Sequence, residues 1–414
     1  MKIVYLHQYF ATKKSVTSTR SYVFAKYLVE QGHEVVVITT ENFLKGEVPY
    51  KKDTVQNYYC IDGIEIRAQI NPYSNYMGTT KRIKSFFSFM QFAYQTGKKI
   101  DGVDLMFSTS TPLTIAISTL RLHRKLKIPY VFEVRDLWPE APKQMGVIKS
   151  KPALMMLRSL EKKVYQKAEH IISLSPGMTT GIEKTGIPST KITMIPNLSD
   201  LELFEKNKAN EPKTQAFIEK YKLEDSFVML HLGAMGEANG LEYIMEAAKG
   251  LKEKHADHIK IIIGGDGKTK PLLEEYCAKH KLDNVIFLGY VPREDVPYIT
   301  AAANITMTSF KRLPILATNS PNKFFDSLAA GKPIIVNSNG WTKDIVEDNE
   351  IGYYVDPLRP NELTDVLIIL QNETVFLTGL EEKIRGIAKD NYNAIDLAEK
   401  ATKIMESVIN ERKY

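Results

Sequence analysis

Short apolar runs alternate with amphipathic stretches along the first half of the chain. Lys2 to Leu6 and Val35 to Ile38 form strand-like runs, and the residues between them carry apolar side chains at helical spacing up to Gly32. This order predicts a strand–helix–strand unit. Unbroken apolar runs are typical of strands buried on both faces, so we predict an open parallel sheet with helices on both faces. Its further strands are expected at 105–107, 130–132, 171–174 and 192–195.

The second half repeats this alternation and predicts a second doubly wound sheet. Its strands are expected at 227–232, 259–263, 285–288, 305–307, 334–336 and 353–355. Helical patterns occur at 241–253, 270–281, 293–302 and 321–330. We therefore predict an N-terminal domain over 1–198 and a C-terminal domain over 199–392. A last helix within 393–414 is expected to pack back on the N-terminal domain.

Candidate chemistry is concentrated at the helix expected after Ser320. Ser320 is a good cap and Pro321 suits the first helical position. The start of a helix offers free N–H groups and a positive dipole end, and Lys323 adds an ammonium there. Asp326 follows on the same face. We interpret the pair as a nucleoside diphosphate site, with Lys323 for the phosphates and Asp326 for the ribose hydroxyls. A solvated Lys and Asp on an ordinary helix explain this segment equally well.

Composition narrows the class of protein. At 414 residues, 43% hydrophobic and 25% charged, the chain is globular and too long for one ordinary core. Cys60 and Cys277 are its two cysteines, which excludes a disulfide framework and a cysteine-based metal cage. This usage fits the reducing cytosol.

The net charge of +6 is unevenly divided. Residues 1–199 contain 28 Lys and Arg against 15 Asp and Glu, a net of +13, and the remainder contains 27 against 34, a net of −7. A basic first half suggests a polyanionic partner, such as nucleic acid or an anionic membrane surface. A simple difference in solubility between the halves is the competing explanation.

Residues 73–99 interleave aromatic and basic side chains. A basic aromatic helix can lie on a membrane surface, here through Lys81, Arg82, Lys84, Phe86 and Phe87. Alternatively, the aromatic side chains fill the core of the first domain. The charge asymmetry favours the membrane.

Five segments, by their order and spacing, resemble the family 4 glycosyltransferases of GT-B fold, which are retaining enzymes. They are Gln-Gly-His-Glu-Val at 31–35, Ile-Pro-Asn at 195–197 with Asp200, Gly-Gly-Asp-Gly at 264–267, Phe-Leu-Gly-Tyr-Val at 287–291, and 321–333. Residues 5–10 with 19–22, and 133–140, resemble the bacterial O-antigen and capsule branch typified by the WbuB-like N-acetylfucosamine transferases.

The resemblance implies two Rossmann-like domains facing a cleft and transfer of a sugar from a UDP-sugar. Our guess for the sugar is N-acetylfucosamine or a related HexNAc. The implied acceptor is a glycan precursor on a polyprenyl diphosphate, in capsule or O-antigen biosynthesis, at the inner face of the plasma membrane. No cofactor or metal is expected, because GT-B enzymes typically need none and the chain has no Asp-x-Asp. No nucleic acid partner is then expected.

The resemblance also implies roles for single residues. Tyr290 and Arg293 would contact the base. The donor diphosphate would lie near the loop and first helical turn of Ser18, Thr19 and Arg20, and near Gly233, Gly236, Ser320 and Asn322. Asp136 would orient the acceptor hydroxyl or accept its proton, and Arg135 would hold the donor diphosphate or the acceptor; a structural Arg135–Asp136 pair is the alternative.

The chain departs from the family at two places. The first of two glutamates common near the donor is Thr318 here, and the second is Asp326. The Arg and Lys common after the first strand of the second domain are replaced by Ala234 and Asn239, so Lys323 is expected to supply the charge, with Lys311, Arg312 and Arg20 in reserve. A UDP-sugar 2-epimerase and a non-catalytic scaffold that binds nucleotide-sugars therefore stay open as alternatives.

Overall fold

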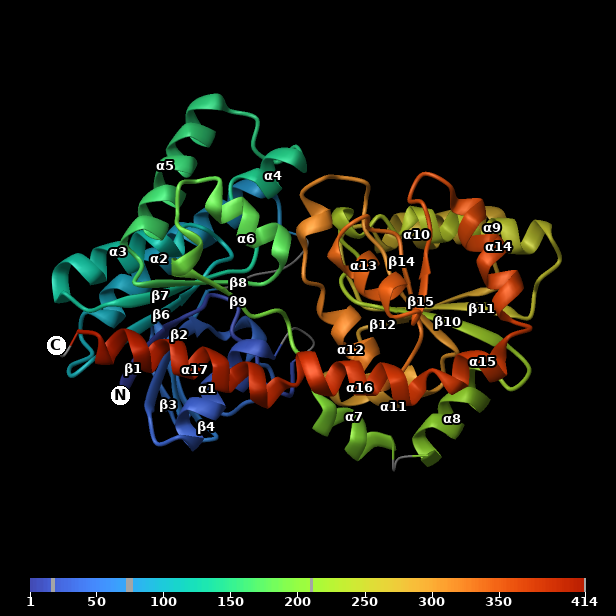
Figure 1. Cartoon of the computed structure of the whole chain (residues 1–414), viewed down its shortest axis with the longest axis horizontal. Coiled ribbons are helices and arrows are strands. Elements are labelled where there is room, and N and C mark those ends of the chain that lie inside the picture. The colour runs from blue at the N-terminus through green and yellow to red at the C-terminus, as the bar shows by residue number, and fades with distance from the viewer. Residues whose placement is uncertain (16–18, 72–76, 209–210, 413–414) are drawn as a thin grey trace. The chain divides into compact units, whose positions relative to one another are not determined.

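The computed structural model describes residues 1–15, 19–71, 77–208 and 211–412, and the chain forms two compact units (Figure 1). The first comprises Met1–Pro196 together with Ala394–Tyr414, and the second comprises Asn197–Asn393. The chain therefore passes between the units within two residues of the expected boundaries at 198/199 and 392/393.

The first unit is built on a nine-stranded sheet of order β3-β4-β5-β2-β1-β6-β7-β8-β9. Strands β1, β2 and β5 to β9 are parallel to their neighbours in that series. Their bounds are β1 Lys2–Leu6, β2 Glu34–Thr40, β5 Ile64–Gln69, β6 Leu105–Thr109, β7 Tyr130–Val134, β8 His170–Ser173 and β9 Ile192–Met194.

One edge of this sheet is antiparallel, which corrects the prediction of a wholly parallel sheet. Strand β4 (Gln56–Ile61) runs antiparallel to β5, and β3 (Lys51–Lys52) runs antiparallel to β4. Asp62 and Gly63 form the two-residue turn between β4 and β5, with φ of 50° and 77°. Two left-handed residues define the turn that matches the twist of a hairpin, and Asp-Gly is its common sequence.

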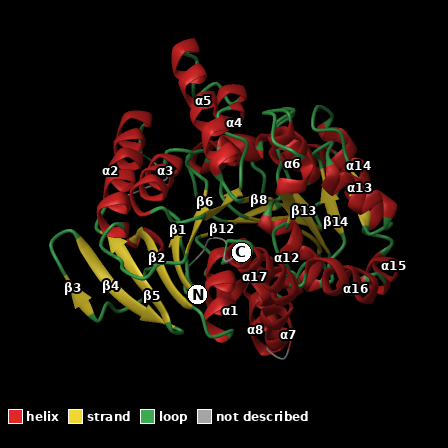
Figure 2. Cartoon of the chain, turned by 60° about the vertical axis from the view of Figure 1, so that its left-hand side comes forward, coloured by secondary structure: helices red, strands yellow, loops and turns green. Residues whose placement is uncertain are grey.

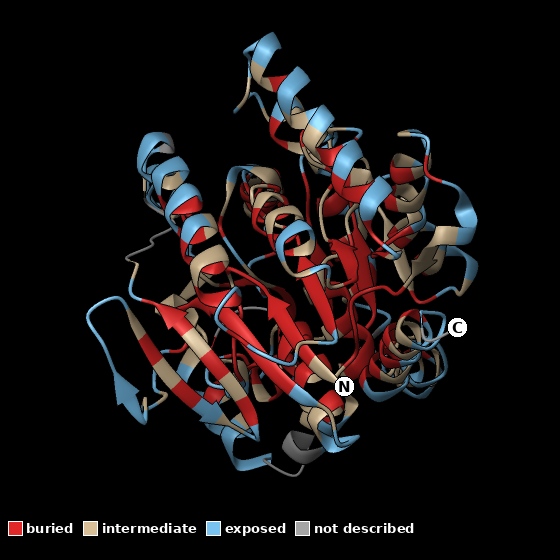
Figure 3. Cartoon of the chain, turned by 90° about the vertical axis from the view of Figure 1, so that its left-hand side faces the viewer, coloured by how far each residue is buried: buried red, intermediate tan, exposed pale blue. Residues whose placement is uncertain are grey.

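Helices cover both faces of the first sheet (Figure 2). Helices α2, α3 and α5 lie on one face, and α1 and α17 pack together on the other. The strands between them are buried, whereas the outer faces of the helices are exposed (Figure 3). The helices are α1 Arg20–Glu30, α2 Thr79–Gly97, α3 Ile115–Leu126, α4 Glu140–Gln144, α5 Lys151–Lys167, α6 Pro176–Glu183 and α17 Ala394–Asn410, with 3-10 turns η1 Glu41–Phe43 and η2 Ser189–Lys191.

The second unit is built on a six-stranded parallel sheet of order β12-β11-β10-β13-β14-β15. Alternate residues of its central strands face opposite sides, as the two-residue period of a strand requires. Met229 and Ile261 belong to one apolar cluster, and Leu230 and Ile262 to another. The strands are β10 Phe227–Leu232, β11 Ile259–Gly264, β12 Val285–Gly289, β13 Ile305–Thr308, β14 Ile334–Val336 and β15 Gly352–Tyr354.

Helices and 3-10 turns connect these strands. The helices are α7 Leu201–Lys208, α8 Glu211–Tyr221, α9 Glu242–Glu253, α10 Lys270–His280, α11 Val296–Ala301, α12 Asn322–Ala330, α13 Trp341–Asp348, α14 Pro360–Leu370, α15 Thr374–Gly379 and α16 Glu381–Tyr392. The turns are η3 Glu237–Asn239, η4 Arg293–Asp295 and η5 Leu316–Thr318. Helix α12 carries the predicted diphosphate site, and Gly331 ends it with φ of 70°.

Candidate functional site

Two glycine-rich loops meet at the carboxyl end of β10 in the second unit. Gly233 follows the strand with φ of 150°, and its N–H donates to the Gly264 carbonyl at 2.9 Å. A Cβ on Gly265 would lie 1.8 Å from the Gly233 carbonyl oxygen. Only residues without a Cβ allow backbones to approach this closely. The missing Cβ of Gly233 in turn leaves space for a side chain from α12.

Lys323 of α12 occupies that space. A Cβ on Gly233 would lie 2.9 Å from its Cε and 3.0 Å from its Nζ. Nζ donates to Asn239 Oδ1 at 2.9 Å and to His231 Nε2 at 3.2 Å. Two segments that are distant in sequence, residues 231–239 and helix α12, therefore meet at one ammonium group.

His231 holds this ammonium through a neutral ring. The buried Nδ1 lies 3.0 Å from the carbonyl oxygen of Met307. Because a carbonyl only accepts, Nδ1 carries the ring proton and Nε2 offers a lone pair to Lys323. Burial and the Lys323 charge keep the pKa of His231 well below its ordinary value. The imidazole therefore orients the ammonium without neutralising it.

The ammonium of Lys323 has no carboxylate partner among the described residues. Burial alone lowers its pKa to about 7. Its described hydrogen-bond partners are the neutral Asn239 and His231, which leaves one of its three N–H donors for another acceptor. The start of α12 also lacks a side-chain cap. A partly buried cation beside an uncapped helix start is suited to an anion such as a phosphate.

Asp326 lies one turn further along α12 and is already paired. Its two carboxylate oxygens accept from Arg293 Nη1 at 2.6 Å and Nη2 at 2.7 Å. The side chain of Arg293 is 12% exposed, so Arg293 does not face water. Each oxygen keeps a second lone pair, so the ribose role of Asp326 stays a prediction. Contact of Arg293 with a base also stays a prediction. The structure shows the guanidinium bonded to the Asp326 carboxylate instead.

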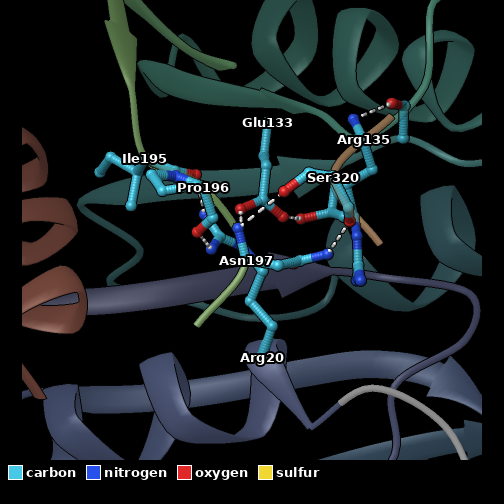
Figure 4. A network of polar contacts seen from close by, with 9 residues as sticks. Arg20, Glu133, Arg135, Ile195, Pro196, Asn197 and Ser320 are labelled. Carbon is cyan, nitrogen blue, oxygen red and sulfur yellow. Dashed lines mark hydrogen bonds and ion pairs between the residues drawn. The ribbon is translucent and has the colours of Figure 1, made fainter. Parts of the chain in front are cut away.

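Ser320 does not cap α12, contrary to the prediction. Helix α12 begins at Asn322, and Pro321 takes the cap position without a side-chain bond. Asn197, the first residue of the second unit, donates its backbone N–H to Ser320 Oγ at 3.1 Å (Figure 4). The Asn197 side-chain amide also donates to the Ser320 carbonyl. Ser320 thus connects the start of the second unit to the segment before α12, and no described side chain caps the helix start.

Arg20 is a structural residue in this structure, not a donor ligand. Its guanidinium is buried and donates to Glu133 Oε1 at 2.8 Å (Figure 4). It also donates to the carbonyls of Ile195, at 2.9 Å, and Pro196. A partnered, fully enclosed guanidinium cannot reach a substrate, so its reserve role is wrong. Thr19, at the start of α1, is buried. Ser18 lies outside the described residues.

Asp136 and Arg135 follow β7 in the first unit. Thr111 donates its hydroxyl to Asp136 Oδ2 at 2.8 Å. The N–H of Arg135, which Figure 4 labels, donates to Ser110 Oγ at 3.2 Å. Burial raises the pKa of the Asp136 carboxyl above its ordinary value, and the Thr111 bond opposes that rise. A raised pKa makes a carboxylate a better proton acceptor. Neighbouring His7 is buried, and burial holds its pKa far too low for it to carry charge at neutral pH.

The remaining predicted donor residues lie at the same rim of the second sheet. Tyr290 follows β12 and is exposed, and Gly236 lies between β10 and η3. Asn322 is the first residue of α12. These positions are compatible with contacts to a base or a phosphate, and those contacts stay predictions.

Of the predicted membrane residues on helix α2, some lie in the core and some on the surface. Phe86 is buried, because it belongs to the inward face of α2 with Phe89 and Phe92, so its predicted membrane contact is wrong. Phe87, Lys81 and Lys84 are exposed, whereas Arg82 is partly buried. Among the described helices none is both long and apolar enough to cross a bilayer.

Sequence reasoning missed His231 and Asn239. A histidine inside the apolar run 227–232 was a signal, because a buried imidazole needs a hydrogen-bond partner. Asn239 occupies a position where the family commonly has a basic residue, and that departure was noted only as a loss of charge. In the structure Asn239 accepts a hydrogen bond from Lys323. This site therefore has a hydrogen-bond acceptor at the position where the family commonly has a second cation.

Comparisons with known proteins point to one class of enzyme. Residues 17–203 match the Glycosyltransferase Family 4 family, and residues 213–385 match the Glycosyl transferases group 1 family. A probable glycosyltransferase, WbjE of Pseudomonas aeruginosa, is 22% identical over 341 residues, which cover 81% of this chain and 82% of WbjE.

Solved structures share the whole fold. Sucrose-phosphate synthase of Thermosynechococcus elongatus aligns over 99% of both chains with a TM-score of 0.76 and 15% identity. Anabaena Alr3699/HepE, solved in complex with UDP and glucose, aligns over 98% of this chain and 100% of its own with a TM-score of 0.70 and 16% identity. The predicted GT-B fold is thereby confirmed.

Proposed function

From the premise that this chain is a glycosyltransferase of the GT-B fold, we propose that it takes its sugar from a UDP-sugar and binds the diphosphate at Lys323. The observation that carries the proposal is an ammonium in the first turn of α12 whose hydrogen-bond partners, within the described part of the chain, are neutral groups. HepE, which shares the fold, binds UDP and glucose, and this supports a uridine donor.

The site contributes to transfer by stabilising the leaving group. When the anomeric C–O bond breaks, negative charge develops on the UDP phosphate, and donors already aimed at that charge lower the barrier. Lys323 and the N–H groups at the start of α12 supply such donors without rearrangement, because His231 and Asn239 hold the ammonium. A bound metal is not needed for this role, and we propose that the reaction proceeds without one.

The finer features of the reaction are proposed from the resemblance of the chain to the O-antigen and capsule branch. They are retention of the anomeric configuration, a deoxyhexosamine such as N-acetylfucosamine as the sugar, and an acceptor on a polyprenyl diphosphate. The basic first half of the chain supports an acceptor at an anionic membrane surface, with Lys81, Arg82, Lys84 and Phe87 as the expected contacts. Asp136, with its raised pKa, is proposed to orient the acceptor hydroxyl or accept its proton.

UDP binding to a matched pair of variants tests the proposal. Lys323→Met is expected to weaken UDP binding roughly 10- to 100-fold, because a charge-assisted contact is lost. Lys268→Met is the control, since Lys268 lies in the neighbouring loop but is already paired with Glu237 at 2.7 Å. Calorimetry with UDP measures both. Equal affinity of the Lys323 variant and the unaltered protein would remove Lys323 from the site.

Turnover separates transfer from the other activities considered. UDP release from a panel of UDP-sugars is expected only when a lipid-linked acceptor is present, and excess chelator is expected to leave the rate unchanged. Isomerised donor without UDP release would indicate an epimerase, and binding without turnover would indicate a scaffold. A chelator-sensitive rate restored by added metal would contradict the metal-free mechanism.

A further inference from the structure

Three neighbouring helices of the first unit form a layer that is basic on its outer side. Helices α2, α3 and α5 pack side by side on one face of the sheet, with α3 between the other two (Figure 2). Their spans contain eleven Lys and Arg and one acidic residue, Glu161, which is buried. We call this group of helices the basic layer.

The opposite face of the same sheet is electrically balanced. Helices α1 and α17 together contain four Lys and Arg and four Asp and Glu. Lys403 and Lys26 there pair with glutamates one turn away. The basic layer pairs its charges far less: among the described residues of α5, Arg158 alone has an acidic partner, Glu140 at 3.5 Å. The positive charge of the first half is thus concentrated on one side of one unit.

The basic layer also exposes large apolar side chains. Met155 and Met156, near the start of α5, are 71% and 65% exposed, and Val147 is exposed in the preceding loop. Lys162 and Lys163 follow seven residues later, so they lie on the same side of α5 as the two methionines. Ile83 and Phe87 are exposed on α2. Apolar side chains flanked by lysines are the pattern of a helix that lies in a membrane interface.

We propose that the basic layer docks on an anionic lipid bilayer, with Met155 and Met156 entering the headgroup region and the lysines of α5 contacting lipid phosphates. Helix α5 makes the main contact with the bilayer, and Lys81, Lys84 and Phe87 of α2 make further contacts. The inference deepens the lipid-linked acceptor of the proposed function, because it names the surface that would meet the membrane.

The apolar groups favour a bilayer over a nucleic acid. A nucleic acid would be held by phosphate contacts and by stacking on aromatic rings, and an exposed pair of methionines contributes to neither. A bilayer uses both parts of the pattern, since burial of methionine side chains adds to the attraction between lysines and anionic lipids. The charge and the exposed apolar groups therefore point to the same partner.

Vesicle binding by the full chain tests the inference. The probe is flotation with vesicles of phosphatidylglycerol and phosphatidylcholine, with pure phosphatidylcholine vesicles in parallel. Lys162→Gln with Lys163→Gln is expected to lower partitioning to the anionic vesicles about tenfold or more. Lys400→Gln with Lys403→Gln, which removes the same charge from α17 on the balanced face, is expected to lower it less than about twofold. Met155→Ser with Met156→Ser is expected to weaken binding several-fold and to make the remainder sensitive to salt.

The vesicle measurements either support or overturn docking through the basic layer. A selective loss in the α5 variants supports docking through the basic layer. Equal losses in the α5 and α17 variants, no binding to anionic vesicles, or full displacement from vesicles by an equal charge of single-stranded RNA would overturn it. UDP affinity in solution is expected to be unchanged in all three variants, so docking can fail while the donor site stands. A retained melting temperature confirms that each variant is folded.

Discussion

Arg20 and Lys323 are cations in the first turn of a helix, one in each unit, yet their surroundings differ in kind. Arg20 has a carboxylate and two carbonyls around its guanidinium, and its side chain is fully enclosed. Lys323 has an amide oxygen and a neutral imidazole, and burial lowers its pKa to about 7. The charge of Arg20 is balanced by Glu133, whereas no carboxylate in the described ranges of the chain pairs with Lys323.

The difference separates a structural cation from a binding cation. A buried charge is costly unless a partner of opposite sign compensates it. Arg20 meets that condition through Glu133, so it joins α1 to β7 and to the last residues before the second unit. Lys323 meets it only when an anion from outside arrives. Charge compensation, more than position at a helix start, therefore identifies the ligand site.

Removing the partner of Arg20 should have the largest effect. Glu133→Ala leaves a buried guanidinium uncompensated, and we expect a loss of about 3–5 kcal/mol in the free energy of unfolding. Lys323→Met should leave that free energy unchanged or raise it, because it removes a cation that lacks a carboxylate. Urea denaturation of the two variants measures both values. Equal destabilisation by the two substitutions would contradict the comparison.

A methyl group beside Lys323 should have an intermediate effect. Gly233→Ala places a Cβ about 3 Å from Lys323 Cε and Nζ and requires a φ that side chains rarely adopt. We expect UDP affinity to fall several-fold as the ammonium is displaced. Gly386→Ala, in helix α16 of the same unit, is the control, since its Cβ would meet no atom within 4 Å. Calorimetry that gave both variants the same affinity would show that the space beside Gly233 is not needed.

Proton uptake on binding is the smallest expected effect. At pH 8 the free site has lost most of the Lys323 proton, and a bound diphosphate raises its pKa, so UDP should bring in about one proton. The neutral His231 does not contribute, because its pKa lies well below 6.5. Calorimetry in buffers of different ionisation enthalpy measures the uptake. The same uptake in Lys323→Met would assign the proton to another group.

The same pKa sets the pH dependence of stability. Below about pH 7 the folded and unfolded states both hold the Lys323 proton. Between about 7 and the ordinary lysine pKa of 10.5 only the unfolded state holds the proton, so this group makes stability rise with pH across that window. In the complex with UDP, where the bound diphosphate raises this pKa, the rise of stability with pH should be smaller.

The sequence was most informative where one pattern had one structural solution. Unbroken apolar runs predicted β1, β10 and β14 to the residue, because strands buried on both faces need continuous hydrophobicity. Strands β3, β4 and β5 were missed, since strands that are exposed or only partly buried along their length give a weaker apolar signal. Asp62-Gly63 was the available sign of that hairpin.

The candidate site could be predicted only in part. Lys323 was identified from its place at a helix start, which is a local property. Its partners His231 and Asn239 lie 92 and 84 residues away, and no local pattern joins them. Arg20 and Ser320 were misassigned for the same reason. Arg20 bonds to Glu133, and Ser320 accepts from Asn197, and both partners are distant in sequence.

The position of helix α17 in the sequence determines when the first unit can be completed during synthesis. It is synthesised after the whole of the second unit, yet it packs on α1 and belongs to the first unit. The ribosome must therefore make all of Asn197–Asn393 before the earlier unit acquires its closing piece. A message cut short near residue 393 would yield an intact later unit attached to an unfinished earlier one.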